Sequence, residues 1–294
     1  MPRVLVAGST GYLGSYVVRE LKRRGMWVRA IVRRPQQQSG LQPWTDDIVV
    51  AEVTKPDTLR HVADDVDVVF SSIGITRQRD GFTYEDVDYR GNVNLLTVAK
   101  ARSVSRFVYV SILQGPSLRE LPMVDAKERF VGALRESGLP YTILRPTGFF
   151  SDMTSYVTMA RRGLVVLFGD GTAQINPISG RDLATACADA MLGCRSEIPI
   201  GGPYAFSYNS IAAMAFHALR KRPRVWHLKG WQTDALARIA RSFTPRSLGG
   251  PLEFVLTVTR RDMIAPRFGQ DRLDAFLEQG PSPHVPEDSL LSWR

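Results

Sequence analysis

Cysteine is scarce in this sequence of 294 residues, which has only two, and histidine occurs four times. Cys187 and Cys194 lie seven residues apart in one helical pattern, which forms neither a disulfide framework nor a metal-ligand spacing. The histidines, at positions 61, 217, 227 and 284, are scattered, and no Ser-His-Asp arrangement is visible. We therefore expect no metal site, and the cysteine usage favours a reducing cytoplasm.

Long hydrophobic runs are missing as well. No apolar stretch approaches the roughly 20 residues that a transmembrane helix needs. The first predicted strand begins near residue 3, which leaves no room for a signal peptide. We therefore expect a cytoplasmic protein without a membrane span, for which a peripheral contact is the one membrane interaction left open.

The sequence also lacks a concentrated block of charge. The net charge of +9 divides into +5 over residues 1–150, −1 over 151–205 and +5 over 206–294. No nucleic-acid motif accompanies it, so we expect no nucleic-acid partner. The run Arg220-Lys-Arg-Pro-Arg224 follows a predicted helix, where cations usually complement the helix dipole. The alternative is a contact with an anion or a membrane headgroup.

The first two dozen residues carry the strongest pattern. A short apolar run, Val4 to Ala7, is followed by three glycines at a spacing of three and then by apolar residues at helical spacing. This order of strand, glycine turn and helix is the context of a dinucleotide-binding fingerprint. Gly8 would permit the tight turn, Gly11 a close approach to a pyrophosphate, and Gly14 the packing of helix on sheet. The alternative is a glycine turn that binds nothing.

The end of the second predicted strand, residues 27–32, bears on the choice of cofactor. NAD-binding sites usually have Asp or Glu here to hold the ribose 2′-hydroxyl. This sequence has Arg33 and Arg34 instead. An arginine fork pairs with a 2′-phosphate that a carboxylate would repel, so the pattern favours NADP(H) over NAD(H). The alternative is that both arginines merely face solvent.

Strands and helices alternate through the first two thirds of the chain. Further strands are predicted over 48–53, 66–71, 106–111 and 141–145, and helices over 56–63, 86–101, 125–137 and 181–192. The alternation predicts an α/β fold with a Rossmann-like, doubly wound parallel sheet. We expect an NADP(H)-binding core over 1–150, a smaller, mainly helical substrate region over 151–280 interwoven with the core, and a flexible tail over 281–294.

Seven short motifs occur along the chain: Val-Ala-Gly8-Ser-Thr-Gly11-Tyr-Leu-Gly14, Val-Arg-Ala-Ile-Val-Arg33, Asp-Val-Val-Phe-Ser-Ser72, Tyr-Val-Ser111, Ala-Lys127, Leu-Arg145-Pro146-Thr147 and Asn176-Pro-Ile-Ser-Gly-Arg-Asp-Leu183. They resemble motifs of the atypical short-chain dehydrogenase/reductases, and in particular of the NmrA-like NAD(P)-binding proteins and the divinyl chlorophyllide reductases. The resemblance covers about residues 1–205 well and the remainder loosely. It is specific for fold and cofactor and poor for substrate.

The resemblance implies a role for individual residues toward NADP(H). Thr10, Gly11, Tyr12 and Leu13 would line the pyrophosphate, with Arg33 at the 2′-phosphate. The remaining implied contacts are Glu52 and Val53 at the adenine, Ser72, Ile73 and Gly74 at the ribose, Lys127 at the nicotinamide ribose, and Pro146 and Thr147 at the nicotinamide amide.

One departure from the family pattern falls where the chemistry should be. The family at large has Tyr-x-x-x-Lys, in which the lysine lowers the tyrosine pKa and the phenol passes a proton to substrate. Here the pair is Met123 and Lys127, and a thioether cannot donate a proton. Ser111 could still polarise a carbonyl; alternatively its hydroxyl satisfies backbone groups at a strand end.

Three functions are compatible with this departure. In the first, the protein reduces an apolar substrate at an activated C=C bond or a carbonyl, and Lys127 orients the cofactor or acts as an acid. In the second, it binds NADP(H) without turnover, as a redox sensor. In the third, it is an accessory or assembly subunit that keeps a vestigial nucleotide site. The sequence leaves the substrate, the proton donor, the oligomeric state and any protein partner undefined.

Overall fold

A computed structural model of the chain describes residues 1–75, 81–230, 232 and 246–279. The predicted tail over 281–294 lies outside these residues. The chain forms two compact units. The first consists of Met1–Ile75, Phe82–Arg145 and Gly180–Pro199, and the second of Thr76–Gly81, Pro146–Ser179 and Ile200–Arg294.

A seven-stranded sheet with the order β3-β2-β1-β4-β5-β6-β9 forms the centre of the first unit, which confirms the predicted doubly wound fold. Its strands are β1 Arg3–Ala7, β2 Trp27–Val32, β3 Asp47–Val50, β4 Val68–Ser71, β5 Arg106–Val110, β6 Tyr141–Pro146 and β9 Glu197–Ile200. The pairings from β3 through β6 are all parallel, with Ala7 opposite Ser71 and Ser71 opposite Tyr109. The strand β9 was not predicted, because it contains Pro199 and runs into Gly201, Gly202 and Pro203, which are typical of a turn.

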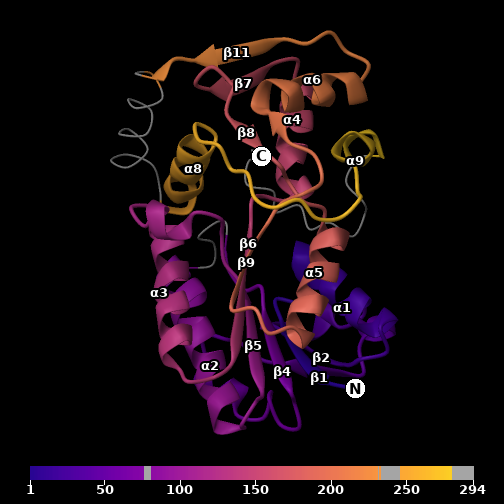
Figure 1. Cartoon of the computed structure of the whole chain (residues 1–294), viewed down its shortest axis with the longest axis vertical. Coiled ribbons are helices and arrows are strands. Elements are labelled where there is room, and N and C mark those ends of the chain that lie inside the picture. The colour runs from indigo at the N-terminus through magenta and orange to yellow at the C-terminus, as the bar shows by residue number, and fades with distance from the viewer. Residues whose placement is uncertain (76–80, 231, 233–245, 280–294) are drawn as a thin grey trace. The chain divides into compact units, whose positions relative to one another are not determined.

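Helices cover both faces of this sheet. The α-helices of the first unit are α1 Tyr12–Arg23, α2 Asn92–Ala101, α3 Pro122–Glu136 and α5 Gly180–Leu192. The helices α1 and α5 pack together, as do α2 and α3, and Figure 1 shows the two pairs on opposite sides of the strands. Leu5, Phe107 and Tyr109 of the sheet and Phe130 of α3 belong to one buried cluster. Strands buried on both faces explain why their sequences are continuous apolar runs.

Short helices link these elements, and one of them is a π-helix. The 3₁₀ segments are η1 Pro35–Gln37, η2 Gln42–Trp44, η3 Pro56–Leu59 and η5 Gly115–Leu118. The π-helix η4 covers Glu85–Gly91 and continues directly into α2. The sequence predicted one α-helix over 86–101, because apolar periodicity does not distinguish a π-turn from an α-turn. A π-helix is rare and frequently lies at a functional site.

The second unit combines helices with two small sheets. Its elements are α4 Phe150–Arg161, β7 Val165–Phe168, β8 Gln174–Ile175, β10 Phe206–Ser207, α6 Tyr208–Ala218, β11 Val225–Leu228, α8 Arg246–Val258 and α9 Leu273–Gln279. The strands β10 and β8 pair antiparallel, and β11 pairs with β7 in parallel. Among the described residues, no helix is both long and apolar enough to cross a bilayer.

Candidate functional site

The carboxyl ends of the parallel strands bring the predicted site residues of the first unit to one edge of the sheet. Along this edge, neighbouring positions are taken by the segments that follow β3, β2, β1, β4 and β5, in that order. This spatial order differs from the order of the segments in the chain. The predicted site residues in these segments, listed in the same spatial order, are Glu52 and Val53, Arg33 and Arg34, Gly8 to Leu13, Ser72 to Gly74, and Ser111. The strand order reverses between β1 and β4, which is the switch point where open α/β sheets bind ligands.

The turn after β1 depends on its glycines. Gly8 has a φ of +86°, a left-handed conformation that side chains disfavour, and its carbonyl accepts the Gly11 N–H at 3.0 Å. A Cβ on Gly14 would lie 2.0 Å from the Gly8 oxygen, and one on Gly8 would lie 2.8 Å from the Ser72 hydroxyl. The backbone is therefore folded tightly between β1 and the loop after β4.

The start of α1 has no side-chain cap. Gly11 is the residue before the helix, and no side chain caps it. The first turn contains no acidic residue. The first amides of an α-helix point away from the helix body and have no acceptor among the helix carbonyls. This arrangement suits the two phosphates of a dinucleotide, which need donors and a positive dipole end.

The side chains around this turn are used for packing. The Ser9 hydroxyl donates to the carbonyl of Ile31 at 2.6 Å, which ties the turn to β2. The Tyr12 hydroxyl accepts the Gly180 N–H at 3.0 Å, so the side chain of Tyr12 joins α1 to the start of α5. The side chain of Tyr12 is thus occupied, and any contact of this residue with a pyrophosphate would come from its main chain. Nothing in the local sequence pairs Tyr12 with Gly180, because 168 residues separate them.

Arg33 and Arg34 lie side by side after β2, and both are exposed. Their main-chain N–H groups donate to the Gln37 side-chain oxygen at 3.1 and 3.0 Å, which holds the backbone of this corner. Neither guanidinium pairs with a carboxylate among the residues that the structure describes. Two exposed guanidinium groups at the end of β2, the strand that neighbours β1, suit a 2′-phosphate.

The loop after β3 is held by hydrogen bonds to the main chain. Thr58 accepts the Glu52 N–H and donates to the Glu52 carbonyl, each at 3.0 Å. The Val53 carbonyl accepts the Asn94 side-chain amide at 2.9 Å. Both polar groups of the Glu52 main chain are thus occupied, which leaves its side chain and that of Val53 for any contact with an adenine.

Lys127 is held in an ion pair. Its ammonium lies 2.8 Å from the carboxylate of Asp88, a residue of the π-helix whose side chain has no exposed surface. The same carboxylate accepts the Ile75 N–H at 3.1 Å. A Cβ on Gly74 would lie 2.4 Å from the Lys127 nitrogen and 2.6 Å from the Asp88 oxygen. The loop after β4 therefore rests directly on this ion pair.

The surroundings of Lys127 keep it charged. Burial lowers the pKa of its ammonium, but the Asp88 carboxylate and then the Tyr109 phenol raise that pKa by more, so the net shift is upward. Burial also raises the pKa of Tyr109 to about 12. An ammonium with a raised pKa is a poor proton donor at neutral pH, although it can still orient hydroxyl groups.

The π-helix is fastened to β4 through Asn92. The Ser71 hydroxyl donates to the Asn92 side-chain oxygen at 2.6 Å, and the Asn92 amide donates to the Asp88 carbonyl at 2.9 Å. All three residues are completely buried. Sequence reasoning missed Asp88 and Asn92. The only available signal was two polar residues at positions that the helical pattern assigns to the buried side.

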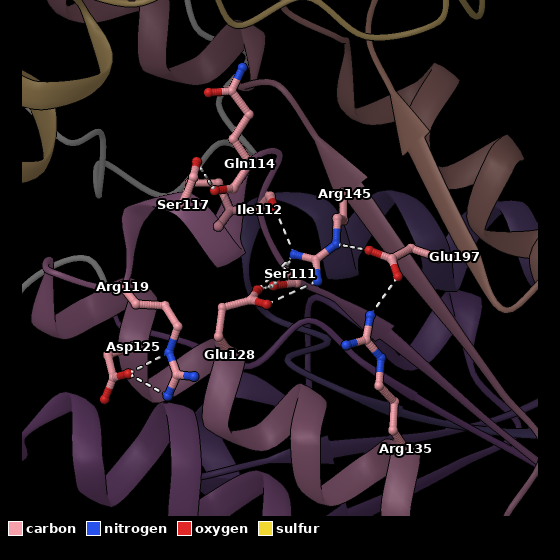
Figure 2. A network of polar contacts seen from close by, with 10 residues as sticks. All are labelled: Ser111, Ile112, Gln114, Ser117, Arg119, Asp125, Glu128, Arg135, Arg145 and Glu197. Atoms are coloured by element: carbon pink, nitrogen blue, oxygen red, sulfur yellow. Dashed lines mark hydrogen bonds and ion pairs between the residues drawn. The ribbon is translucent and has the colours of Figure 1, made fainter.

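Ser111 belongs to a buried ionic network shown in Figure 2. Its hydroxyl donates to Glu128 at 2.8 Å, and Arg145 pairs with both oxygens of Glu128 at 2.6 and 3.0 Å. Arg145 also contacts Glu197, which Arg135 reaches at 2.7 Å. The hydroxyl hydrogen of Ser111 is thus already given to a carboxylate, and its catalytic role stays a prediction.

The other two residues with predicted roles at the nicotinamide, Pro146 and Thr147, belong to the second unit. The Thr147 N–H donates to the Ile200 carbonyl at 3.2 Å, and its hydroxyl donates to the Asn176 carbonyl at 2.7 Å. Met123, at the position of the family tyrosine, is buried in the first unit. An apolar, buried side chain therefore occupies the position at which the family has its tyrosine.

Comparison with known proteins identifies the same segment. The model of a family described as NAD(P)H-binding matches residues 8–192. Divinyl chlorophyllide a 8-vinyl-reductase from Oryza sativa subsp. indica is 31% identical over 320 residues, covering 94% of this chain and 78% of the rice protein. Photosystem II assembly factor Ycf39 from Synechocystis sp. is 27% identical over 246 residues, covering 82% of this chain and 74% of that protein.

A solved structure shows the same fold. The NADPH-dependent quinone oxidoreductase QOR2 from Escherichia coli, complexed with NADPH, superimposes with a TM-score of 0.69. The sequences are 21% identical, and the match covers 94% of this chain and 99% of the oxidoreductase. At this identity the likeness concerns the fold alone.

Proposed function

Because this chain belongs to the NAD(P)H-binding family, as an NmrA-like atypical short-chain dehydrogenase/reductase, we propose that it binds NADP(H) and reduces a small apolar substrate. The observation that supports this proposal most strongly is the turn after β1. A left-handed Gly8, a Gly14 pressed against the Gly8 carbonyl and an uncapped helix start provide a backbone cradle for a pyrophosphate.

The preference for the phosphorylated cofactor is proposed from Arg33 and Arg34. Both guanidinium groups are exposed at the end of β2, and neither pairs with a carboxylate among the described residues. One charge-assisted hydrogen bond is worth about 1.5–3 kcal/mol, which corresponds to tenfold or more in affinity. We expect Arg33 to contribute most of this discrimination.

A binding experiment tests the cofactor proposal. Arg33→Asp should weaken NADPH binding at least about tenfold while changing NADH binding little, as measured by titrating the fluorescence of the reduced nicotinamide. Lys100→Asp makes the same change of charge at an exposed position on α2 and should leave both affinities unchanged. Equal losses of NADPH and NADH in Arg33→Asp would refute the 2′-phosphate role.

The chemistry proposed for the site is reduction of an activated C=C bond. NADPH, when bound, supplies the hydride. Met123 provides no phenol, and Asp88 keeps Lys127 charged, so Lys127 would hold the cofactor ribose instead of donating a proton. In a C=C reduction, the proton can come from water, whereas carbonyl reduction by the family at large uses the tyrosine that is missing here. A relative named as a vinyl reductase supports this choice.

Non-catalytic binding is the second candidate, because Met123 removes the usual proton donor and another relative is named as an assembly factor. NADPH oxidation measured with a panel of enones and vinyl-substituted substrates separates the two functions. Tight NADPH binding without turnover on any substrate would favour a sensor or accessory subunit. A partner released when NADPH is replaced by NADP⁺ would indicate a sensor, and a redox-independent complex would indicate an accessory subunit.

A further inference from the structure

The second unit carries a concentration of positive charge where two helices end. Arg161 is the last residue of α4, and the segment from α6 to β11 contains four more cations. Figure 1 shows this segment running from α6 to β11, beside β7. All five side chains are exposed: Arg161, Arg220, Lys221, Arg222 and Arg224. We call these five residues the basic edge.

Main-chain contacts hold the basic edge together. The Lys221 ammonium donates to the Arg161 carbonyl at 2.9 Å, which joins the end of α4 to the residues that follow α6. The Val165 N–H donates to the Arg224 carbonyl at 3.0 Å, and from there β7 and β11 pair in register. None of the five cations forms an ion pair with a carboxylate in the described part of the chain.

The helix dipole does not account for these charges. Its effect falls off within the last turn of a helix, and α6 ends at Ala218. Arg222 and Arg224 lie four and six residues beyond that end. Lys221 does contact a helix carbonyl, but this carbonyl is that of Arg161 at the end of α4. A dipole role therefore explains Lys221 and leaves Arg222 and Arg224 unexplained.

Arg220 occupies a position where glycine would be the ordinary residue. Its φ is +53°, in the left-handed region, and the Lys221 N–H donates to the Phe216 carbonyl at 3.0 Å, as in a Schellman motif. The helix α1 ends with the same bonding pattern, but with Gly25 at a φ of +74°. An arginine in this conformation is strained relative to glycine, so Arg220→Gly should not weaken the fold.

Two large apolar side chains are exposed beside the cations. Leu164 precedes β7 and is 41% exposed, and Trp226 of β11 is 56% exposed. Each lies within three residues of the basic edge in the chain. Cations next to an exposed indole and an aliphatic side chain fit the boundary of a bilayer, where headgroups carry the negative charge and Trp is favoured. We propose that the basic edge, with Leu164 and Trp226, docks on the surface of an anionic lipid bilayer.

The proposal does not depend on the cofactor or on catalysis, since none of its residues has a predicted role in cofactor binding or in the reaction. A nucleic acid would also attract the cations and could stack on Trp226. An exposed Leu164 offers nothing to a phosphate backbone or to a stacked base, whereas it can enter the apolar layer beneath lipid headgroups. A bilayer therefore accounts for all three kinds of side chain.

Vesicle sedimentation tests the proposal with the full chain. The wild-type protein should sediment with phosphatidylcholine vesicles in which about a third of the lipid is phosphatidylglycerol, and not with phosphatidylcholine alone. Each cation near such a surface contributes about fivefold to affinity, so Arg222→Glu/Arg224→Glu should bind at least about thirtyfold more weakly. Lys100→Glu/Arg195→Glu makes the same change of charge on exposed residues of the first unit and should bind as the wild type does.

Arg220→Gly separates binding from folding. It removes a cation and relieves the left-handed strain, so its midpoint of thermal unfolding should stay the same or rise while vesicle affinity falls about fivefold. A blue shift of tryptophan fluorescence on adding vesicles should disappear in Trp226→Phe. Equal binding to neutral and anionic vesicles, or wild-type binding by Arg222→Glu/Arg224→Glu, would overturn the proposal. Tighter binding to single-stranded DNA than to vesicles would do so as well.

Discussion

The Asp88 carboxylate lies 2.8 Å from the Lys127 ammonium, and the Asp88 side chain is completely buried. Asp88 is brought there by a π-helix, and Lys127 by the first half of α3. The pair lies beneath Gly74, at the loop that follows β4. A lysine that the family pattern assigns to the cofactor is thus fixed in place by a carboxylate that the pattern does not mention.

Removing the charge of Asp88 should destabilise the protein strongly. In Asp88→Asn the Lys127 ammonium loses its partner in a mostly buried place, and breaking such a pair costs about 3–5 kcal/mol. We expect a loss of that size in the free energy of unfolding measured by urea denaturation, together with weaker NADPH binding.

Glu85→Gln is the matched control on the same π-helix. Glu85 pairs with Arg129 and Arg90 at partly exposed positions, with distances of 2.5 and 3.2 Å. Exposed pairs contribute about 1 kcal/mol or less. If Asp88→Asn cost no more than Glu85→Gln, the ion pair with Lys127 would have no special importance.

Gly74→Ala should displace the loop after β4. An added methyl group would fall 2.4 Å from the Lys127 nitrogen, so either the lysine or the loop must move. We expect lower stability and weaker NADPH binding, measured by urea denaturation and fluorescence titration. Gly132→Ala, on α3, is the control because nothing lies within 4 Å of its Cβ position. It should stabilise the protein by about 0.5–1 kcal/mol, as alanine does in a helix. Equal effects of the two substitutions would contradict the contact.

Asp152 should make stability depend on pH. Burial raises the pKa of its carboxyl from 3.8 to about 6, while the Phe149 N–H that it accepts lowers it in part. The folded chain therefore binds extra protons between these two values, and its stability falls as the pH rises from about 4 to about 6. The full shift corresponds to about 3 kcal/mol, and partial exposure of Asp152 reduces this to about 2 kcal/mol.

Asp152→Asn isolates that effect. The asparagine keeps an oxygen that can accept the Phe149 N–H, at 2.9 Å in the wild type, but it does not titrate. The difference in unfolding free energy between variant and wild type should therefore grow in favour of the variant as the pH rises from 4 to 7. Stability curves that stay parallel over this range would show that the carboxyl has its ordinary pKa.

The network around Arg145 should respond unequally to its two carboxylates. Glu128 is 5% exposed and Glu197 is 34% exposed, and both pair with Arg145. Glu128→Gln removes the buried charge and should cost about 3 kcal/mol of unfolding free energy. Glu197→Gln should cost about 1 kcal/mol, because water screens that pair. Equal costs in urea denaturation would show that burial does not govern this network.

The local sequence was sufficient for the elements that repeat an apolar pattern. The strand over 27–32 was predicted with both ends correct, because Trp27 to Val32 is apolar except for Arg29 and stops at two arginines. The glycine turn was equally readable, since glycine is favoured at the φ of Gly8 and a side chain on Gly14 would collide with the Gly8 carbonyl. Such features depend on residues that are neighbours in the chain.

The sequence alone thus determined the parallel α/β fold, the glycine turn after β1 and the cations after β2, since each depends on residues that are close together in the chain. Only the tertiary structure decided that Asp88 meets Lys127, that the Ser111 hydroxyl donates a hydrogen bond to Glu128, and that Lys221 reaches the end of α4. These contacts join residues that are 17 to 60 positions apart. They exist because packing brings separate elements together, so that polar groups far apart in the chain become each other's partners.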